Sequence, residues 1–362
     1  MGTQLDSDIA TTAPPPSIDL DPERIEFGRI FVPLWLTARY ADGAWQQPRV
    51  ERIGSIDLHP AAIVFHYGQA IFEGLKAYKW ADGSVHLFRP VENARRFNRS
   101  AERMAMPPLD EKVFVEGIRD LVSREREWIP EFPGSLYIRP TMIGTEACIG
   151  VRPSHEVLFF VLTLPSGAYF PKSAGSTGTQ TVPVYVTTGV GRAAPGGTGN
   201  VKAAANYAVT LKVIGDAKKK GCAQVLFLDA RGRGNIEEMG GMNVFFVSGK
   251  KLITPFLHDT VLPGVTRDSI LRLAPELGFE AVEADISFAA LIEQIQKGEV
   301  TEAFACGTAA VIAGIDTFVL DDGRKISVGS GKCGPVTDRL YHHLVDIQYG
   351  KRPDPFGWMI EV

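Results

Sequence analysis

The chain has 362 residues, of which 45% are hydrophobic and 22% are charged, as is ordinary for a globular protein with large cores. This length favours two domains. The net charge of -4 and the lack of a basic stripe argue against nucleic-acid binding, and no segment indicates a membrane span. The four cysteines are too far apart for a C-x-x-C pair, which predicts reduced thiols, a cytoplasmic location and no metal site.

Changes in composition along the chain indicate the domain limits. Residues 1–20 are mostly polar and contain a proline run without an export signal, so we expect a disordered tail. Residues 173–181 hold mainly small and polar side chains, which predicts an interdomain linker. We therefore expect a small N-terminal domain over 21–172 and a larger domain over 182–362.

The first half alternates strand and helix patterns. Two antiparallel strands are expected over 31–53 around the turn Asp42-Gly43, and a dense apolar stretch follows at 63–78. Hydrophobic periodicity then predicts a strand ending at Phe88, helices over 92–106 and 110–128, and strands over 135–140 and 156–164.

Two polar arrangements in this half are candidates for binding anions. Arg96, Arg99 and Arg103 share one side of the expected helix, as a solvated face or an anion site would. Tyr137 and Arg139 are two residues apart and therefore point to the same face of their strand. A phenol beside a guanidinium suits a carboxylate, although an exposed polar sheet face is the commoner explanation of such a pair.

A glycine-rich turn at 196–199 leads to Lys202 in the second half. Between Arg192 and Lys212 no other residue is charged, and small side chains are its neighbours in the sequence. We expect water to be scarce there, which lowers the pKa of the lysine and yields a neutral amine that can attack an aldehyde. The alternative is a solvated lysine at the start of a helix.

The rest of the second half mixes strands and helices. The expected order is a strand over 182–188, a helix over 206–219, a hairpin of 223–229 with 243–247, helices over 268–277 and up to Gly298, a strand over 302–306 and a helix over 336–349. Glu238 lies in the hairpin connection among apolar and glycine neighbours, either as a surface side chain or as a functional one. Gly264 leads a helix start, whose amides suit a phosphate.

Two segments imitate nucleotide-binding motifs. Gly189 to Ala194 follows a strand like a dinucleotide fingerprint, but Pro195 and a glycine run come where the helix should begin. Gly331-Lys332 resembles the end of a P-loop, but Cys333 replaces the Ser or Thr that would hold magnesium. We reject both motifs.

Six segments in this order resemble the branched-chain amino acid aminotransferases, which use pyridoxal 5'-phosphate. They are 72–78, 137–140, 196–207, 237–243, 262–267 and 307–309, and the match runs from about Phe27 to Gly350. The resemblance implies the type IV fold of pyridoxal-phosphate enzymes, an α/β protein with a small α/β domain and a larger β-barrel-like domain with helices.

The resemblance also implies a role for each matching residue. Lys202 would form the internal aldimine and then move the proton between the substrate and cofactor carbons. Glu238 would keep the ring nitrogen protonated, and Tyr207 would donate to the ring oxygen. The other implied cofactor contacts are Arg192 and, at the phosphate, Arg96, the amides of Val265 and Thr266, and Thr308.

Substrate contacts follow from the same resemblance. The implied partners of the α-carboxylate are Tyr137 and the amides of Thr308 and Ala309, and Arg139 would receive the distal carboxylate of glutamate. The apolar substrate side chain would lie against Phe72 and Tyr169 and, from the second subunit of a homodimer, Tyr67 and Val151. The run Val32-Pro33-Leu34-Trp35 departs from the Thr-Asp-His-Met usual in relatives, and Ala310 and Ala313 replace a redox C-x-x-C of vertebrate relatives.

The expected activity is reversible amino-group transfer between L-leucine, L-isoleucine or L-valine and 2-oxoglutarate, giving branched 2-oxo acids and L-glutamate. Relatives with the same fold act on D-amino acids or (R)-amines, or are aminodeoxychorismate lyases. From other classes, a nicotinamide-dependent oxidoreductase would use residues 189–194, and a non-catalytic module would use the apolar pocket. The sequence leaves open the ranking of the branched substrates, the use of aromatic ones, the physiological direction and any assembly beyond a dimer.

Overall fold

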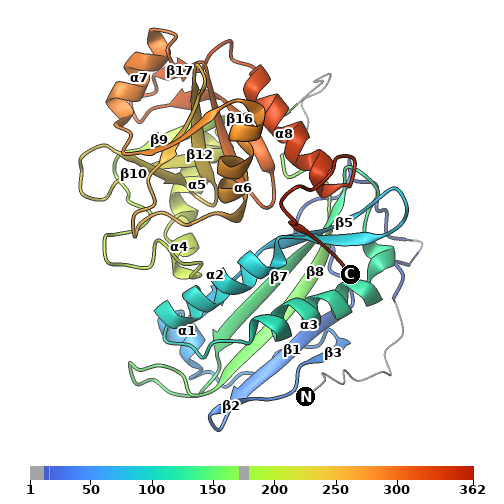
Figure 1. The fold of residues 1–362 in the computed structure, drawn as a ribbon. Helices are drawn as coiled ribbons and strands as arrows, with labels where there is room; N and C mark the ends of the chain where they lie inside the picture. Colours follow the sequence, from blue (N-terminus) through green and yellow to red (C-terminus); the bar gives the residue numbers. More distant parts are fainter. Residues whose placement is uncertain (1–11, 16, 171–178) are drawn as a thin grey trace. The chain divides into compact units, whose positions relative to one another are not determined.

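The computed structural model describes residues 12–15, 17–170 and 179–362. Contacts between Cα atoms divide the chain into two units (Figure 1). Unit 1 comprises Met1–Tyr169, Lys202–Ala204 and Asp346–Val362, and unit 2 comprises Phe170–Val201 and Ala205–Val345. The sequence analysis assigned 182–362 to one domain without interruption. Most of the expected tail and linker, at 1–11, 16 and 171–178, lies outside the described residues.

Unit 1 is built on one antiparallel sheet, in the order β18-β6-β5-β7-β8-β1-β2 with β3 on β1 and β4 on β7. Its strands are β1 Leu34–Ala41, β2 Ala44–Trp45, β3 Arg49–Arg52, β4 Ala70–Phe72, β5 Leu75–Lys79, β6 Val85–Phe88, β7 Ser135–Gly144, β8 Val157–Ser166 and β18 Met359–Glu361. Its helices are α1 Ile63–Tyr67, α2 Pro90–Arg103, α3 Glu111–Arg124 and the short 3-10 turn Arg126–Trp128.

Local chemistry explains several of these elements. Asp42 and Gly43 both have positive φ, 53° and 78°, which is the turn geometry that joins the tightest antiparallel hairpins, here β1 and β2. Asp110 caps α3 by accepting a hydrogen bond from the amide of Lys112 at 2.7 Å. The predicted strands and helices of the first half are present, with β7 and β8 each longer than expected, but the helix expected over 110–128 ends at Arg124 and a separate 3-10 turn follows.

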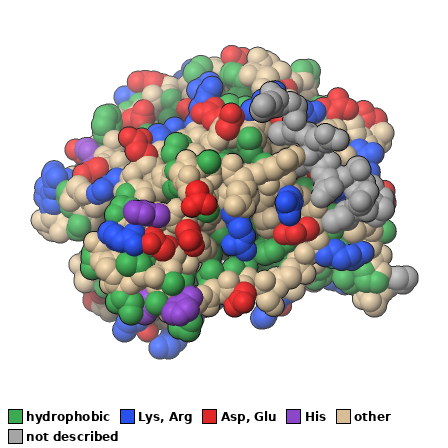
Figure 2. All heavy atoms as spheres, turned by 90° about the horizontal axis from the view of Figure 1, so that it is seen from below, with side chains coloured by type: hydrophobic (Ala, Val, Ile, Leu, Met, Phe, Trp, Pro, Cys, Tyr) green, Lys and Arg blue, Asp and Glu red, His purple; other side chains and the backbone are tan. Residues whose placement is uncertain are grey.

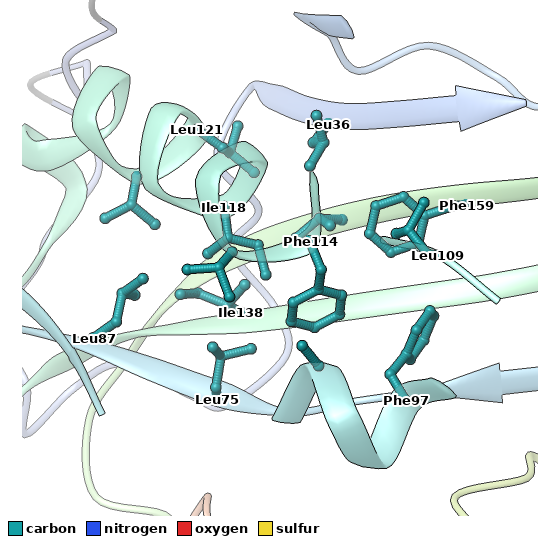
Figure 3. Packing of buried hydrophobic residues seen from close by; sticks show 14 of the residues in the cluster. Leu36, Leu75, Leu87, Phe97, Leu109, Phe114, Ile118, Leu121, Ile138 and Phe159 are labelled. Carbon is teal, nitrogen blue, oxygen red and sulfur yellow. The ribbon is translucent and has the colours of Figure 1, made fainter. Parts of the chain in front are cut away.

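An apolar core holds α2 and α3 against one face of the sheet (Figure 3). Phe97 of α2, Phe114 of α3 and Phe159 of β8 meet with ring centroids 5.4 to 6.1 Å apart. All three are fully buried, and each contributes roughly 1.5–3 kcal/mol through removal of its side chain from water. This packing fixes α2, and so the place of Arg96, relative to the strands.

Unit 2 contains a mixed sheet in the order β11-β10-β9-β16-β15-β12-β13-β14, with β17 on β16. Its strands are β9 Thr181–Thr187, β10 Gln224–Leu228, β11 Ile236–Met239, β12 Asn243–Ser248, β13 Lys251–Pro255, β14 Glu280–Ala284, β15 Glu302–Gly307, β16 Val311–Val319 and β17 Lys325–Ser327. Its helices are α4 Ala205–Ala208, α5 Leu211–Lys219, α6 Val265–Leu273, the 3-10 turn Pro275–Leu277, α7 Phe288–Gln296 and α8 Pro335–Gln348, whose last three residues belong to unit 1.

Two predictions for unit 2 are wrong. The expected hairpin of β10 with β12 does not form, because the connecting residues are themselves a strand, β11, that pairs with β10. β12 pairs instead with β13 and β15. The helix expected over 206–219 is interrupted between α4 and α5, where the hydroxyl and the amide of Thr210 both donate to the Tyr207 carbonyl, at 2.8 and 3.1 Å.

The surface and composition of the described part of the chain are those of an ordinary globular protein. Acidic, basic and apolar side chains are interspersed over the face drawn in Figure 2. None of the helices in the described ranges is both long and apolar enough to cross a membrane. Among the same residues, no three His, Cys, Asp or Glu side chains are grouped so that they could hold a metal ion.

Candidate active site

Lys202 lies beside β4 in unit 1. The amide of Phe72 donates to the Lys202 carbonyl at 3.1 Å, Ala203 bridges to Ile71, and the Lys202 amide donates to the Ser100 hydroxyl at 3.0 Å. Its Nζ is 4.9 Å from the centre of the Phe72 ring. The lysine therefore precedes α4, and its side chain is partly buried.

The charges around Lys202 come from distant parts of the chain. Burial is the main cause that lowers its pKa to about 8, and the Arg96 cation adds to the effect. Glu73 and Tyr137 act in the opposite direction, and Arg139 again lowers the pKa. The predicted lowering is confirmed. We call Lys202, Phe72, Glu73, Arg96, Tyr137 and Arg139 the lysine cluster.

Glu73 and Arg96 form a buried ion pair in this cluster. Arg96 donates from Nε to Glu73 Oε1 at 2.6 Å and from Nη2 to Oε2 at 2.8 Å. Asn93 and the amide of Gly74 also donate to Oε2, at 2.8 and 3.1 Å. Although burial would raise it, the pKa of Glu73 is lowered, chiefly by the Arg96 charge. Of the predicted arginine stripe, Arg96 is buried, whereas Arg99 and Arg103 are exposed.

Tyr137 and Arg139 share one face of β7, as predicted, with Arg139 Nη2 donating to the Tyr137 hydroxyl at 2.9 Å. Arg139 also lies over the Phe72 ring, 4.7 Å from its centre. Gly74 allows this arrangement, since a Cβ there would lie 2.9 Å from Tyr137 Cζ and closer still to its hydroxyl. Lys76 is the cross-strand partner of Tyr137 and therefore shares its face.

The other predicted substrate residues of unit 1 lie in two places. Tyr169 joins the lysine cluster through Phe27, whose ring packs edge-on against both Tyr137 and Tyr169, at 5.0 and 5.4 Å. Tyr67 and Val151 are instead exposed, and the Tyr67 hydroxyl donates to the carbonyl of Ile149. Tyr67 and Val151 are therefore surface side chains of unit 1, whereas Tyr169 packs beside the lysine cluster.

Unit 2 holds Glu238 on β11 in a second buried ion pair, with Arg192. Glu238 Oε1 accepts from the Leu262 amide at 2.9 Å, and Arg192 Nη2 donates to the carbonyls of Gly199 and Thr260, at 2.7 and 2.9 Å. Glu238 is thus a buried and fully held carboxylate, unlike a surface side chain. We call Arg192, Glu237, Glu238, Asn243, Thr260 and Leu262 the carboxylate cluster.

Four further candidates lie at the start of α6 and in the connection of β15 to β16, and Tyr207 lies on α4. Asn243 donates to the Leu262 carbonyl at 3.0 Å, and α6 begins at once after Gly264, which has no side chain to cap the helix. A Cβ at Gly264 would collide with the Asn243 side chain. Val265 and Thr266 are the first two residues of α6, and Thr308 and Ala309 connect β15 to β16.

Comparison with known proteins shows the family to which this chain belongs. A model for "Amino-transferase class IV" matches residues 70–318, more than half of the chain. A probable branched-chain-amino-acid aminotransferase of Streptomyces coelicolor is 45% identical over 336 residues, which cover 92% of this chain and 91% of the relative. This chain is a class IV aminotransferase of the branched-chain-amino-acid aminotransferase family.

Solved structures of this aminotransferase family confirm the predicted fold. The Escherichia coli branched-chain amino acid aminotransferase has a TM-score of 0.74 at 30% identity, covering 89% of this chain and 98% of that one. The branched-chain amino acid aminotransferase of Thermobaculum terrenum, solved in its PLP-form, has a TM-score of 0.71 at 24% identity, covering 90% and 97%. The chain therefore has the type IV fold.

Class IV aminotransferases use pyridoxal phosphate, and the side chains of this chain fit that cofactor. Lys202 supplies an amine whose pKa of about 8 allows it to react with an aldehyde near neutral pH. Glu238 supplies a buried carboxylate of the kind that holds a protonated ring nitrogen. No side chain caps the start of α6, and backbone amides at the start of a helix suit a phosphate.

Two buried residues of the segment 72–78, Glu73 and Lys76, had no role predicted from the sequence, although both belong to a segment that resembles the family. Burial lowers the pKa of Lys76 to about 8. Lys76 lies between the apolar Leu75 and Ala77 in β5, but the register that makes it the cross-strand partner of Tyr137 has no local signal in the sequence.

Proposed function

We propose that this chain catalyses reversible amino-group transfer between L-leucine, L-isoleucine or L-valine and 2-oxoglutarate. The lysine cluster carries the proposal, because it places a lysine of lowered pKa with a tyrosine and arginine pair and an aromatic ring. Tyr137 and Arg139 suit carboxylates, and Phe72 suits an apolar side chain. The family relationship supports the same activity.

Lys202 is proposed as the catalytic residue. With a pKa of about 8, about a quarter of the molecules carry a neutral amine at pH 7.5, against roughly one in a thousand for an ordinary lysine. The neutral Nζ removes the proton from the substrate α-carbon, and the ammonium so formed delivers a proton back in the course of the transfer. Pyridoxal phosphate, when bound, supplies the electron sink that makes this carbon acid strong enough.

Different side chains are proposed to contact the ring nitrogen, the ring oxygen and the phosphate of the cofactor. Glu238, held in place by Arg192, keeps a proton on the ring nitrogen, and Tyr207 donates to the ring oxygen. Arg96, Thr308 and the amides of Val265 and Thr266 hold the phosphate. The burial of Glu238 supports its assignment, since a carboxylate removed from water holds a cation far more strongly than an exposed one.

Substrate recognition is proposed to use one side-chain pocket for two kinds of group. Tyr137 and the amides of Thr308 and Ala309 hold the α-carboxylate. Phe72 and Tyr169 contact an aliphatic side chain, and Arg139 receives the second carboxylate of glutamate. The contact of Arg139 with the Phe72 ring supports this, because the guanidinium presents both a charge and a flat apolar surface.

The active form is proposed to be a homodimer located in the cytoplasm. Phe65, Tyr67, Ile149 and Val151 lie on α1 and the loop after β7, with exposed fractions of 62%, 40%, 65% and 88%. Such a group of exposed apolar side chains is typical of a surface covered by a partner. Tyr67 and Val151 would then contact the substrate bound by the other copy. Val151→Arg should yield monomers in light-scattering measurements and remove activity.

Initial rates with a panel of amino donors test the activity. We expect L-leucine, L-isoleucine and L-valine to react with 2-oxoglutarate, and D-amino acids and (R)-amines to react slowly or not at all. Faster reaction with D-donors or (R)-amines would assign the chain to another activity of the same fold. A visible absorption band that borohydride abolishes should accompany the activity, whereas a nicotinamide-dependent oxidoreductase would lack it.

A further inference from the structure

Glu73, in the connection between β4 and β5, accepts four hydrogen bonds. Its carboxylate receives both donors of the Arg96 pair, the Asn93 amide and the Gly74 amide, and it is fully buried. Three of these donors come from side chains of α2 and one from the backbone. A charged hydrogen bond in a dry site is strong and directional, so both oxygens have fixed positions.

The segment of Lys202 lies next to this carboxylate. Phe72, the residue before Glu73, donates its amide to the Lys202 carbonyl, and the next two residues of the segment continue along β4. Ser100, one turn after Arg96 on α2, accepts from the Lys202 amide and donates to the Arg96 carbonyl, at 3.0 and 2.9 Å. The end of β4 and helix α2 therefore fix Glu73, Arg96 and the backbone of Lys202 relative to one another.

We propose that Glu73 is a positioning residue for the proton of Lys202, acting as the anion that Arg96 and Asn93 fix beside the strand end to which the Lys202 segment is hydrogen-bonded. The inference rests on the proposed catalytic role of Lys202, which makes this proton functionally important. The proposed role of Glu73 can be tested in the chain without bound cofactor.

The charged groups that face Lys202 have opposing effects. Arg96 from α2 and Arg139 from β7 favour the neutral amine, whereas Glu73 and the Tyr137 hydroxyl favour the ammonium. Lys76, whose own pKa is lowered to about 8 by burial, lies on the strand face of Tyr137. Without Glu73, burial and these cations would act on Lys202 almost unopposed. The carboxylate thus keeps a buried lysine basic enough to hold the proton that it has removed.

The test measures the pKa of Lys202 in the full-length chain freed of cofactor. Competitive acylation with acetic anhydride over a range of pH, read by mass spectrometry of the Lys202 peptide, gives that pKa directly. For Glu73→Gln we expect a pKa about one unit below that of the parent, since an opposite charge nearby shifts a pKa by roughly that much or more. A variant with a cooperative melting transition and an unchanged or raised pKa overturns the proposal.

The matched control is Glu92→Gln, which removes one carboxylate charge from α2, the helix that carries Arg96. Glu92 pairs with the exposed Arg95 at 2.8 Å, and the Lys202 pKa should stay as in the parent. A second comparison guards against poor folding of the single variant. The Arg96→Gln chain should have a higher Lys202 pKa than the parent, and adding Glu73→Gln to it should lower the value by about one unit. Equal values for these two chains overturn the proposal.

The proposed function fails in a different way. Borohydride reduction of the loaded parent enzyme, followed by mass spectrometry, should place the cofactor on Lys202. A label on another lysine rejects the catalytic assignment but leaves the Lys202 pKa comparison readable. In the loaded enzyme, Glu73→Gln should also move the acidic limb of the pH–rate profile to lower pH, whereas a purely structural role would lower the rate at every pH.

Discussion

Each unit contains a buried arginine–glutamate pair, and the two pairs differ in what surrounds them. The Glu73–Arg96 pair of unit 1 belongs to a cluster with two further basic side chains, Lys202 and Arg139, and Lys76 shares the strand face of Tyr137. The Arg192–Glu238 pair of unit 2 lies beside a second carboxyl, Glu237, whose pKa is raised by burial. One cluster thus has an excess of basic groups and the other an excess of acidic ones.

This difference indicates what each cluster can hold. A buried arginine–glutamate pair is nearly neutral and attracts a charged ligand group only weakly. The other charged side chains of each cluster therefore decide which ligand groups are stabilised. The surplus of cations in unit 1 suits carboxylates and a phosphate. The surplus of carboxyl groups in unit 2 suits a protonated ring nitrogen. Replacing one charged side chain at a time therefore tests the comparison.

The largest effect is expected from Lys202→Ala, which removes the one group in the lysine cluster proposed to move a proton. Turnover should fall below about one ten-thousandth of the parent rate, because both proton transfers lose their base. Steady-state rates with L-leucine measure this, and the melting temperature should stay close to that of the parent. Lys212→Ala, at an exposed lysine paired with Asp216 at 2.7 Å, is the control and should keep full activity.

In the opposite cluster, Glu238→Gln should slow the proton-transfer step about a hundredfold. The amide cannot hold a positive charge on the ring nitrogen, and Arg192 loses its buried partner. Single-turnover absorbance changes at saturating L-leucine measure the step. The exposed Glu293→Gln should leave it unchanged. If the Glu238 variant reacts at the parent rate, the carboxylate cluster has no part in catalysis.

Arg139→Ala sharpens the comparison within unit 1, because it removes a cation that only one substrate should need. A charge-assisted hydrogen bond contributes roughly 1.5–3 kcal/mol, so the glutamate half-reaction should fall on the order of ten- to 150-fold. The leucine half-reaction should change little. Mixing each amino acid with the loaded variant and following the cofactor spectrum separates the two half-reactions.

The control for Arg139 is Arg39→Ala, an exposed arginine on β1 of the same sheet. It should affect neither half-reaction. Parallel losses with leucine and glutamate, together with a lower melting temperature, would show that Arg139 supports the sheet and has no part in recognising the second substrate.

The smallest effect is expected at Glu125, a buried carboxyl of unit 1 without an arginine. Burial raises its pKa to about 8, although hydrogen bonds from the Thr163 hydroxyl, at 2.6 Å, and the Leu34 backbone oppose this. The folded chain thus holds this proton more tightly than the unfolded chain. Stability from the proton is complete below about pH 4.5 and is lost as the pH rises through about 8.

Thermal unfolding of Glu125→Gln against the parent at pH 5 and pH 9 measures this effect. The amide stays neutral, so the variant should melt a few degrees above the parent at pH 9 and no higher than the parent at pH 5. A difference that is the same at both pH values would mean that Glu125 does not titrate in this range.

Much of the secondary structure could be predicted because the signals are local. The Asp42-Gly43 turn, the Asp110 cap and the hydrophobic periodicity of α3 each depend on a few neighbouring residues. The pairing of β11 with β10 was missed because four consecutive buried residues, 236–239, show no alternation, and pairing depends on residues far along the chain.

In the candidate site too, local features could be predicted from the sequence, whereas contacts between distant residues could not. A window without charges around Lys202 predicted the direction of its pKa shift, since burial is the main cause. The opposing charge of Glu73 was not predictable from that window, because Glu73 lies 129 positions earlier in the printed sequence. Likewise, Tyr137 and Arg139 were paired by strand geometry, whereas Lys76 joined them through a register that no local pattern indicates.

Unit 1 obtains its last strand from the far end of the printed sequence. β18 pairs with β6, the Trp358 carbonyl accepts from the Arg89 amide at 2.8 Å, and the Tyr349 hydroxyl donates to the carbonyls of Pro133 and Gly134 at 2.9 and 2.8 Å. A ribosome makes β6 more than 250 residues before β18, so this part of the sheet must wait for the whole of unit 2 to be translated. The unit that is synthesised first is therefore the one that is finished last.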